Sequence, residues 1–98
     1  MTETAGPAER ERADRRQRMK EQIDAALDGL YEIADPVERE LAARVLADEL
    51  LPEAGRRVKA VRSGAVRELR TERGLKLREV AELLDLSVPR VDQLAKGK

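Results

Sequence analysis

The chain has 98 residues, which is enough for one small domain with an extra arm. Twenty Lys and Arg residues balance twenty Asp and Glu residues, so the formal net charge is zero although 41% of the chain is charged. Cys and His are absent, which excludes disulfides and thiolate metal sites and removes the commonest general base and metal ligand.

The apolar residues are almost all Leu, Val, Ala and Ile, and Tyr31 is the only aromatic residue. A β-sandwich of this size shows more aromatic and Thr-rich alternation, so the composition predicts an all-α fold of about five helices. No apolar run approaches the ~20 residues of a membrane span, and no hydrophobic stretch follows the N-terminal charges as in a secretory signal. We therefore expect a cytoplasmic protein that makes no membrane contact.

Charge is distributed unevenly along the chain. Residues 1–51 carry 8 basic and 13 acidic side chains, whereas residues 52–98 carry 12 basic and 7 acidic ones. A basic half of this kind indicates nucleic-acid contact, and the alternative is two solvated faces that attract each other. We expect three segments: a charged, partly disordered arm (1–18), an acidic helical hairpin (19–51) and a basic helical region (52–98).

Residues 1–7 form a small polar tail with Gly6 and Pro7 and are expected to be disordered. Ala8–Lys20 is almost entirely charged and lacks an apolar stripe, so it is predicted to be helical only as an exposed extension with Glu–Arg pairs at helical spacing. Its basic side chains form either an arm that touches phosphates or, since acids lie among them, a solvated face. The solvated face is the favoured interpretation.

From Met19 the apolar residues recur every four and three positions, which predicts a helix that buries one face against a partner helix. The repeat is too short to establish a coiled coil. The partner helix belongs either to the same chain, which is slightly favoured, or to a second subunit. This seam is therefore the candidate dimer or partner interface. It comprises Met19, Ile23, Ala26, Leu27, Leu30, Tyr31 and Ile33.

Residues 34–38 predict a break followed by a new helix. Asp35 is placed to cap that helix, Pro36 suits its first position, and Glu38 is placed to reach back as in a capping box. So short a connection favours antiparallel helices. Pro52 is expected to end this helix or to begin its successor. The stripe predicted to be buried on it consists of Val37, Leu41, Ala42, Val45, Leu46 and Leu50.

Glu53–Arg73 is predicted to be a third helix with a basic surface. Ser63 and Gly64 form a weak point where a kink is expected, because Gly costs on the order of 1 kcal/mol relative to Ala inside a helix. Gly74 is predicted to adopt the left-handed conformation that closes the helix, with Leu75 folding back onto it. The stripe predicted to be buried consists of Ala54, Val58, Val61, Ala65, Val66 and Leu69.

Leu77–Leu94 contains two short apolar-periodic segments on either side of Asp85, Leu86 and Ser87, which is the pattern of a helix-turn-helix. Ser87 is placed to cap the second helix, and Pro89 falls in its first turn. The turn of this motif usually holds Gly in a left-handed conformation, which Asp85 tolerates better than most residues. An ordinary helical hairpin is the alternative. Seven positions are predicted to be buried or small: Leu77, Val80, Ala81, Leu84, Leu86, Val91 and Leu94.

The segment AVRELRTERGLKLREVAELLDLSVPRVDQL resembles the helix-turn-helix regions of bacterial regulators, especially the fourth region of sigma factors and small sigma-like DNA-binding proteins of actinobacteria. The shared features lie in Arg70–Gly74, Glu79–Leu84 and Leu86–Leu94, and the Arg-rich, Lys-poor usage agrees with a high-GC bacterium. The resemblance covers residues 65–94 and does not include the acidic helices before Pro52. It implies DNA binding, but not a complete initiation factor.

These patterns predict sequence-specific binding of double-stranded DNA by a small transcriptional regulator that acts as a dimer. The recognition helix of the motif enters the major groove by its N-terminal residues. Arg90 is expected to pair with guanine, Gln93 with adenine, and Val88 to touch a thymine methyl. The predicted base-reading set is Ser87, Val88, Arg90 and Gln93, and the predicted phosphate contacts are Lys76, Arg78, Lys96, Lys98 and, more weakly, Arg67, Arg70 and Arg73.

A protein adaptor is the alternative hypothesis. Its acidic N-terminal helices would bind an RNA polymerase subunit or another regulator, and the helix-turn-helix would be a structural relic. An enzyme is the poorest choice, because the glycines are isolated and the residues form no catalytic constellation. We expect no cofactor and no metal.

Overall fold

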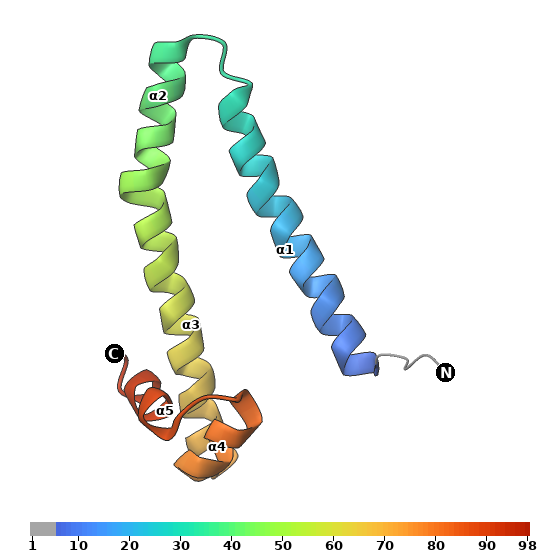
Figure 1. Cartoon of the computed structure of the whole chain (residues 1–98). Coiled ribbons are helices and arrows are strands. Elements are labelled where there is room, and N and C mark those ends of the chain that lie inside the picture. The colour runs from blue at the N-terminus through green and yellow to red at the C-terminus, as the bar shows by residue number, and fades with distance from the viewer. Residues whose placement is uncertain (1–5) are drawn as a thin grey trace. The chain divides into compact units, whose positions relative to one another are not determined.

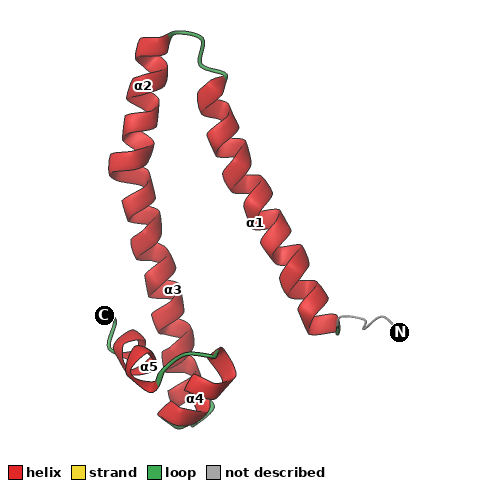
Figure 2. Cartoon of the chain, in the orientation of Figure 1, coloured by secondary structure: helices red, strands yellow, loops and turns green. Residues whose placement is uncertain are grey.

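A computed structural model describes residues 6–98 of the chain (Figures 1 and 2). No β-strand occurs within that range, so the predicted all-α class is confirmed. The chain divides into two compact units, of which the first ends at Val45 and the second spans Leu46–Lys98. The elements are α1 (Pro7–Tyr31), α2 (Pro36–Val45), a π-helical turn η1 (Leu46–Leu50), α3 (Leu51–Thr71), α4 (Leu77–Leu84) and α5 (Val88–Ala95).

The charged N-terminal segment is helical from its first proline onwards. Pro7 begins α1 after the extended Gly6, at a position where the missing N–H of proline costs nothing. Residues 1–5 of the predicted disordered tail lie outside the described residues, and Pro7 belongs to the helix rather than to that tail. Every side chain of Ala8–Lys20 is exposed, so the prediction of an exposed helical extension is confirmed.

In the first unit, α1 and α2 form a helical hairpin joined by a short connection. The Glu38 N–H donates to the Asp35 carboxylate at 3.4 Å, so the predicted cap is confirmed. The guanidinium of Arg39 donates to the carbonyl oxygen of Ile33 at 3.0 Å and holds the connection against α2. These bonds are local, and they fix the start of α2 without burying any side chain.

The burial predicted for the stripe on α2 is wrong. Neither α1 nor α2 contains a buried residue, and the large side chains of that stripe are exposed. Two helices enclose little volume between them, because each touches only one neighbour within the unit. The exposed members of the stripe are Val37, Leu41, Val45 and Leu50, while Ala42 and Leu46 are half-buried.

The break predicted at Pro52 does not occur. Helical structure continues without interruption from Pro36 to Thr71, so residues 6–98 hold four separate helices where about five were predicted. A proline inside a helix removes one hydrogen bond and clashes with the carbonyl four residues earlier. The π-helical turn Leu46–Leu50 lies directly before Pro52, and such a turn is a recognised way to accommodate an interrupted hydrogen-bond ladder.

The apolar stripe of α3 is buried only in its C-terminal half. Ser63 and Val66 are buried, and α3 stays helical through Ser63 and Gly64, so the predicted kink is absent. The helices that pack on α3 are α4 and α5, which have 8 residues each and are therefore about 12 Å long, against about 31 Å for the 21 residues of α3. They cover only part of it. Four positions of the stripe are exposed although they were predicted to be buried: Ala54, Val58, Val61 and Ala65.

The second unit has one small apolar core where α3, α4 and α5 meet. Four of the seven motif positions lie in it, and Leu77 and Leu86 are half-buried at its edge. Leu84 is 41% exposed, so its predicted burial is wrong; it borders an open groove instead. The buried core residues are Val66, Val80, Ala81, Val91 and Leu94.

Asp85 turns the chain between α4 and α5 in the left-handed conformation predicted for it, with φ 53° and ψ 49°. Its N–H donates to the carbonyl of Glu82 at 3.4 Å, and the N–H of Leu86 donates to the carbonyl of Ala81 at 3.0 Å. This pair of bonds is the Schellman closure of a helix. Gly74, with φ 64°, ends α3 in the same conformation, as predicted.

The left-handed turn gives a stability prediction. Replacing Asp85 by glycine is expected to raise the free energy of unfolding of the second unit by about 0.5–1 kcal/mol, because glycine adopts this conformation without a side-chain penalty. Asp85→Val is expected to lower it by about 1–2 kcal/mol. Urea denaturation followed by circular dichroism measures both changes. An unchanged midpoint for both variants would show that the turn carries no strain.

Candidate nucleic-acid interface

The first turn of α5 is fixed by its cap. Ser87 has an extended backbone, and its Oγ accepts the N–H of Arg90 at 3.2 Å, so the predicted cap is confirmed. Pro89 stands in the first turn, where a proline fits the helix. The exposed start of α5 is thus held in one backbone conformation. A fixed backbone is what a reading surface needs, because the side chains are then positioned before a ligand arrives.

The four predicted base-reading residues lie together at that end of α5. Ser87, Val88 and Gln93 are exposed, and Arg90 is half-buried. An Nη1 of Arg90 donates to Oε1 of Gln93 at 3.5 Å, which is the limit of hydrogen-bonding distance. The two side chains therefore occupy one surface and make only a weak mutual bond. Both remain able to exchange that bond for a stronger one with a base edge.

Six of the seven predicted phosphate-contacting residues are exposed, and Arg70 is half-buried. Lys96 makes an ion pair with Asp92 at 2.8 Å, and Arg70 has a buried Nε that has no hydrogen-bond partner. Arg70 is consequently the poorest candidate, because its side chain is half-buried and its Nε is not exposed to solvent. The exposed members of the set are Lys76, Arg78, Lys96, Lys98, Arg67 and Arg73.

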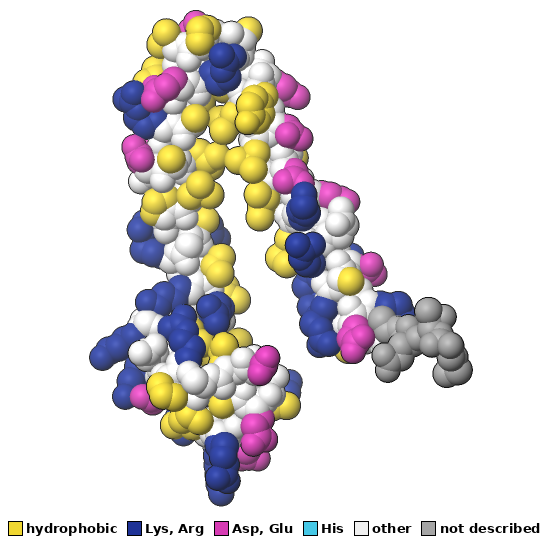
Figure 3. Space-filling model, viewed as in Figure 1, with side chains coloured by type: hydrophobic (Ala, Val, Ile, Leu, Met, Phe, Trp, Pro, Cys, Tyr) yellow, Lys and Arg dark blue, Asp and Glu magenta, His cyan; other side chains and the backbone are white. Residues whose placement is uncertain are grey.

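The electrostatic character of the second unit comes mainly from α3. Residues 46–98 carry 12 basic and 9 acidic side chains, giving a net charge of +3. Figure 3 shows dark blue Lys and Arg side chains gathered along α3 and beside α5. The basic side chains of α3 are Arg56, Arg57, Lys59, Arg62, Arg67 and Arg70. A local basic surface of this kind attracts polyanions even where the net charge of the whole chain is zero.

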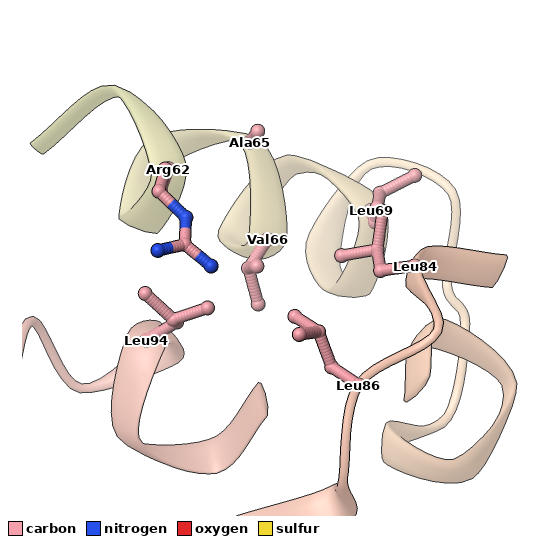
Figure 4. A pocket seen from close by; sticks show the side chains of 7 residues that line it. All are labelled: Arg62, Ala65, Val66, Leu69, Leu84, Leu86 and Leu94. Atoms are coloured by element: carbon pink, nitrogen blue, oxygen red, sulfur yellow. The ribbon is translucent and has the colours of Figure 1, made fainter. Parts of the chain in front are cut away.

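An apolar groove of about 250 Å³ lies between α3 and the two short helices (Figure 4). In that view the guanidinium of Arg62 is directed toward Leu94. The sequence analysis did not predict this groove. The lengths of the helices indicate it, because α4 and α5, with 8 residues each, leave the 21-residue α3 incompletely covered. It is lined by Arg62, Ala65, Val66, Leu69, Leu84, Leu86 and Leu94.

Neither a metal-binding cluster nor a membrane-spanning helix occurs in residues 6–98. That range contains no cluster of three or more carboxylates placed to hold a metal ion. None of its helices is both long enough and apolar enough to cross a lipid bilayer.

Comparisons of the chain with protein-family models, with characterised proteins and with solved structures found no match.

Proposed function

We propose that the second unit binds double-stranded DNA, with α4, the Asp85 turn and α5 acting as a helix-turn-helix. The observation that carries the proposal is the capped, exposed start of α5, on which Arg90 and Gln93 lie side by side. The left-handed turn at Asp85 supports it, because the motif requires that conformation between its two helices. The resemblance of residues 65–94 to the fourth region of sigma factors supports it as well.

The proposed mechanism places the start of α5 in the major groove. Arginine pairs bidentately with O6 and N7 of guanine, and glutamine pairs with N6 and N7 of adenine, so Arg90 and Gln93 have the chemistry to read two base pairs. Val88, which is exposed beside them, offers a methyl contact to thymine. The exposed Lys and Arg side chains around α5 would position the unit on the phosphates. The proposed role is transcriptional regulation in the cytoplasm of a bacterium.

The test is selection of bound sequences from a random pool of DNA duplexes by the full chain. The expected result is an enriched motif of a few base pairs that contains a G·C and an adjacent A·T pair, since those are the bases that Arg90 and Gln93 read. Recovery of the pool without enrichment would contradict sequence-specific reading by α5. Failure to retain any duplex at low salt would contradict DNA binding altogether.

Salt dependence gives a separate prediction. If five to six exposed cations contact phosphates, the logarithm of the association constant should fall with the logarithm of the salt concentration with a slope of about −4.5 to −5.4. Fluorescence anisotropy with a labelled duplex, measured between 50 and 200 mM salt, gives this slope. Replacing Arg78 by Ala is expected to reduce the slope by about one. A flat response would mean that phosphate contacts do not hold the complex.

A further inference from the structure

Three residues of the apolar seam of α1, Met19, Ile23 and Ala26, are not covered by any element of the first unit. Met19 is 52% exposed and Ile23 is 60% exposed, and Ala26 is exposed beside them. α2 does not cover these three residues. The cavity between α1 and α2 is lined instead by Asp24, Leu27, Asp28, Leu30, Tyr31, Arg39 and Ala43. Met19, Ile23 and Ala26 therefore lie outside that cavity, whereas three other members of the seam, Leu27, Leu30 and Tyr31, line it.

Charge is divided between the two halves of α1. From Pro7 to Lys20 the helix carries six basic and three acidic side chains, a net charge of +3, and from Glu21 to Tyr31 it carries three acidic and no basic side chains, a net charge of −3. Figure 3 shows the basic side chains on the N-terminal part of the helix and acidic ones on the other part. Lys20 bonds to Asp24 within the helix, which raises the pKa of Lys20.

This distribution does not stabilise α1 itself. A helix has a positive N-terminal end and a negative C-terminal end, so acidic side chains are favoured near its start and basic ones near its end. Only Glu9 lies in the first turn, and no basic residue lies in the last turn. The division of charge runs against the helix dipole, so a neighbour of opposite polarity would be attracted to it. A second copy of α1 in the reverse direction has that polarity.

The seam specifies the register of such a pair. Continued toward the N-terminus, the spacing of Met19, Ile23 and Ala26 reaches Arg16 and then Arg12. In an antiparallel pair with a two-fold axis at residue 21, Met19 faces the second copy's Ile23, Arg16 faces Ala26, and Arg12 faces Leu30. The arginine stems then lie over small or apolar side chains of an acidic half. A parallel pair would place Arg16 against Arg16 and Arg12 against Arg12.

We infer that the seam of α1 docks against α1 of a second copy of this chain, antiparallel, with the two-fold axis near residue 21. The basic surface of α3 is less suited to cover the seam, because it has the same sign as the first half of α1. The inference does not rest on DNA binding, since α1 lies outside the helices proposed to contact DNA. It is therefore tested without DNA.

Two matched pairs of variants test the seam by sedimentation velocity of the full chain. Ile23→Glu places a charge at the centre of the interface and is expected to raise the dimer dissociation constant at least about 100-fold. The control Ala25→Glu, on the opposite side of α1, is expected to change that constant by no more than about threefold. The double variant Arg12→Glu/Arg16→Glu is expected to raise the dimer dissociation constant at least about tenfold at low salt. The control Arg10→Glu/Arg18→Glu changes the net charge equally but outside the seam, and is expected to have a smaller effect. Far-UV circular dichroism confirms that helix content is kept.

Cross-linking tests the direction, because the chain has no Cys. In the antiparallel pair the Cα atoms of two copies of residue 16 are separated by about 15 Å along the axis, beyond the ~7 Å reach of a disulfide, whereas residue 16 faces residue 26. A mixture of Arg16→Cys and Ala26→Cys chains is therefore expected to form a disulfide-linked heterodimer under oxidation, and neither chain alone is. Cross-linking of Arg16→Cys by itself would overturn the antiparallel arrangement. A wild-type chain that stays monomeric at 200 µM, roughly the range where weak pairs associate, would overturn the inference in favour of a different occupant.

Discussion

Replacing Leu94 by alanine is expected to abolish the cooperative folding of the second unit. Leu94 is 1% exposed and is the largest fully buried side chain of a core with only five buried residues. A buried Leu→Ala change costs about 2–5 kcal/mol, through lost transfer free energy and the cavity that remains. Small domains have total stabilities near the low end of about 5–15 kcal/mol. One truncation therefore removes most of the stability that holds α3, α4 and α5 together.

Thermal and urea unfolding of the full chain measure this effect, and amide hydrogen exchange locates it. Protection should be lost in α3–α5 and remain unchanged in α1. Leu83→Ala is the matched control, because Leu83 belongs to the same helical region but is 66% exposed, so its truncation should change the free energy of unfolding by no more than about 0.5 kcal/mol. Equal effects of the two substitutions would mean that the core does not lie where α3, α4 and α5 meet.

The features that the sequence predicted best are those fixed by neighbouring residues. The cap at Ser87, the cap at Asp35 and the left-handed positions at Asp85 and Gly74 each depend on hydrogen bonds within a few residues. Such bonds follow from the chemistry of the residue and from the periodicity on either side. Sequence reasoning therefore placed the turns of the second unit without knowledge of its packing.

Burial was predicted less well, because periodicity identifies an apolar face but not what covers it. Val58 and Val61 on α3 and Val37 and Leu41 on α2 repeat at helical spacing, yet all four are exposed. The expectation assumed that the chain supplies a partner helix for each face. Within each unit the available helices are too few or too short. In the proposed antiparallel pairing of α1, a second copy of the chain covers an apolar face that one chain leaves exposed.

The helix boundary at Pro52 failed for a different reason. Proline disrupts a regular α-helix, and the prediction treated that disruption as an end. The chain instead inserts one π-helical turn, Leu46–Leu50, and remains helical. Nothing in the local composition distinguishes the two outcomes, since both remove the strained hydrogen bond.

The candidate site was predicted from position in the motif, and its finer geometry was not. The spacing of Arg90 and Gln93 places them one turn apart, so their proximity follows from the helix itself. The half-burial of Arg90 and of Arg70 depends on how α5 and α3 pack. That packing joins residues distant in the sequence, which no local pattern reports.

Substituting both Arg90 and Gln93 by alanine is expected to remove selectivity for DNA while leaving the fold intact. Each bidentate base contact contributes about 1–3 kcal/mol of discrimination. The two side chains touch, so their effects should not simply add, and a combined loss of about 2–4 kcal/mol corresponds to roughly 30- to 700-fold in the ratio of affinities for the selected and a scrambled duplex. The fold should survive, because Gln93 is exposed and Ser87 caps α5 through the backbone N–H of Arg90 rather than its side chain.

A double-mutant cycle on these residues separates base reading from general attraction to DNA. Arg90→Ala alone lowers affinity for all duplexes through its lost charge, whereas its contribution to selectivity should depend on whether Gln93 is present, with a coupling of about 0.5–3 kcal/mol. Arg44→Ala with Gln22→Ala, on the first unit, is the control that removes the same two residue types and should leave the affinity ratio unchanged. If the ratio falls equally in the control, or stays constant in the α5 variant, Arg90 and Gln93 do not read the bases. If affinity falls for every duplex with the ratio preserved, Arg90 serves as a phosphate contact, and the reading residues must be sought among Ser87 and Val88.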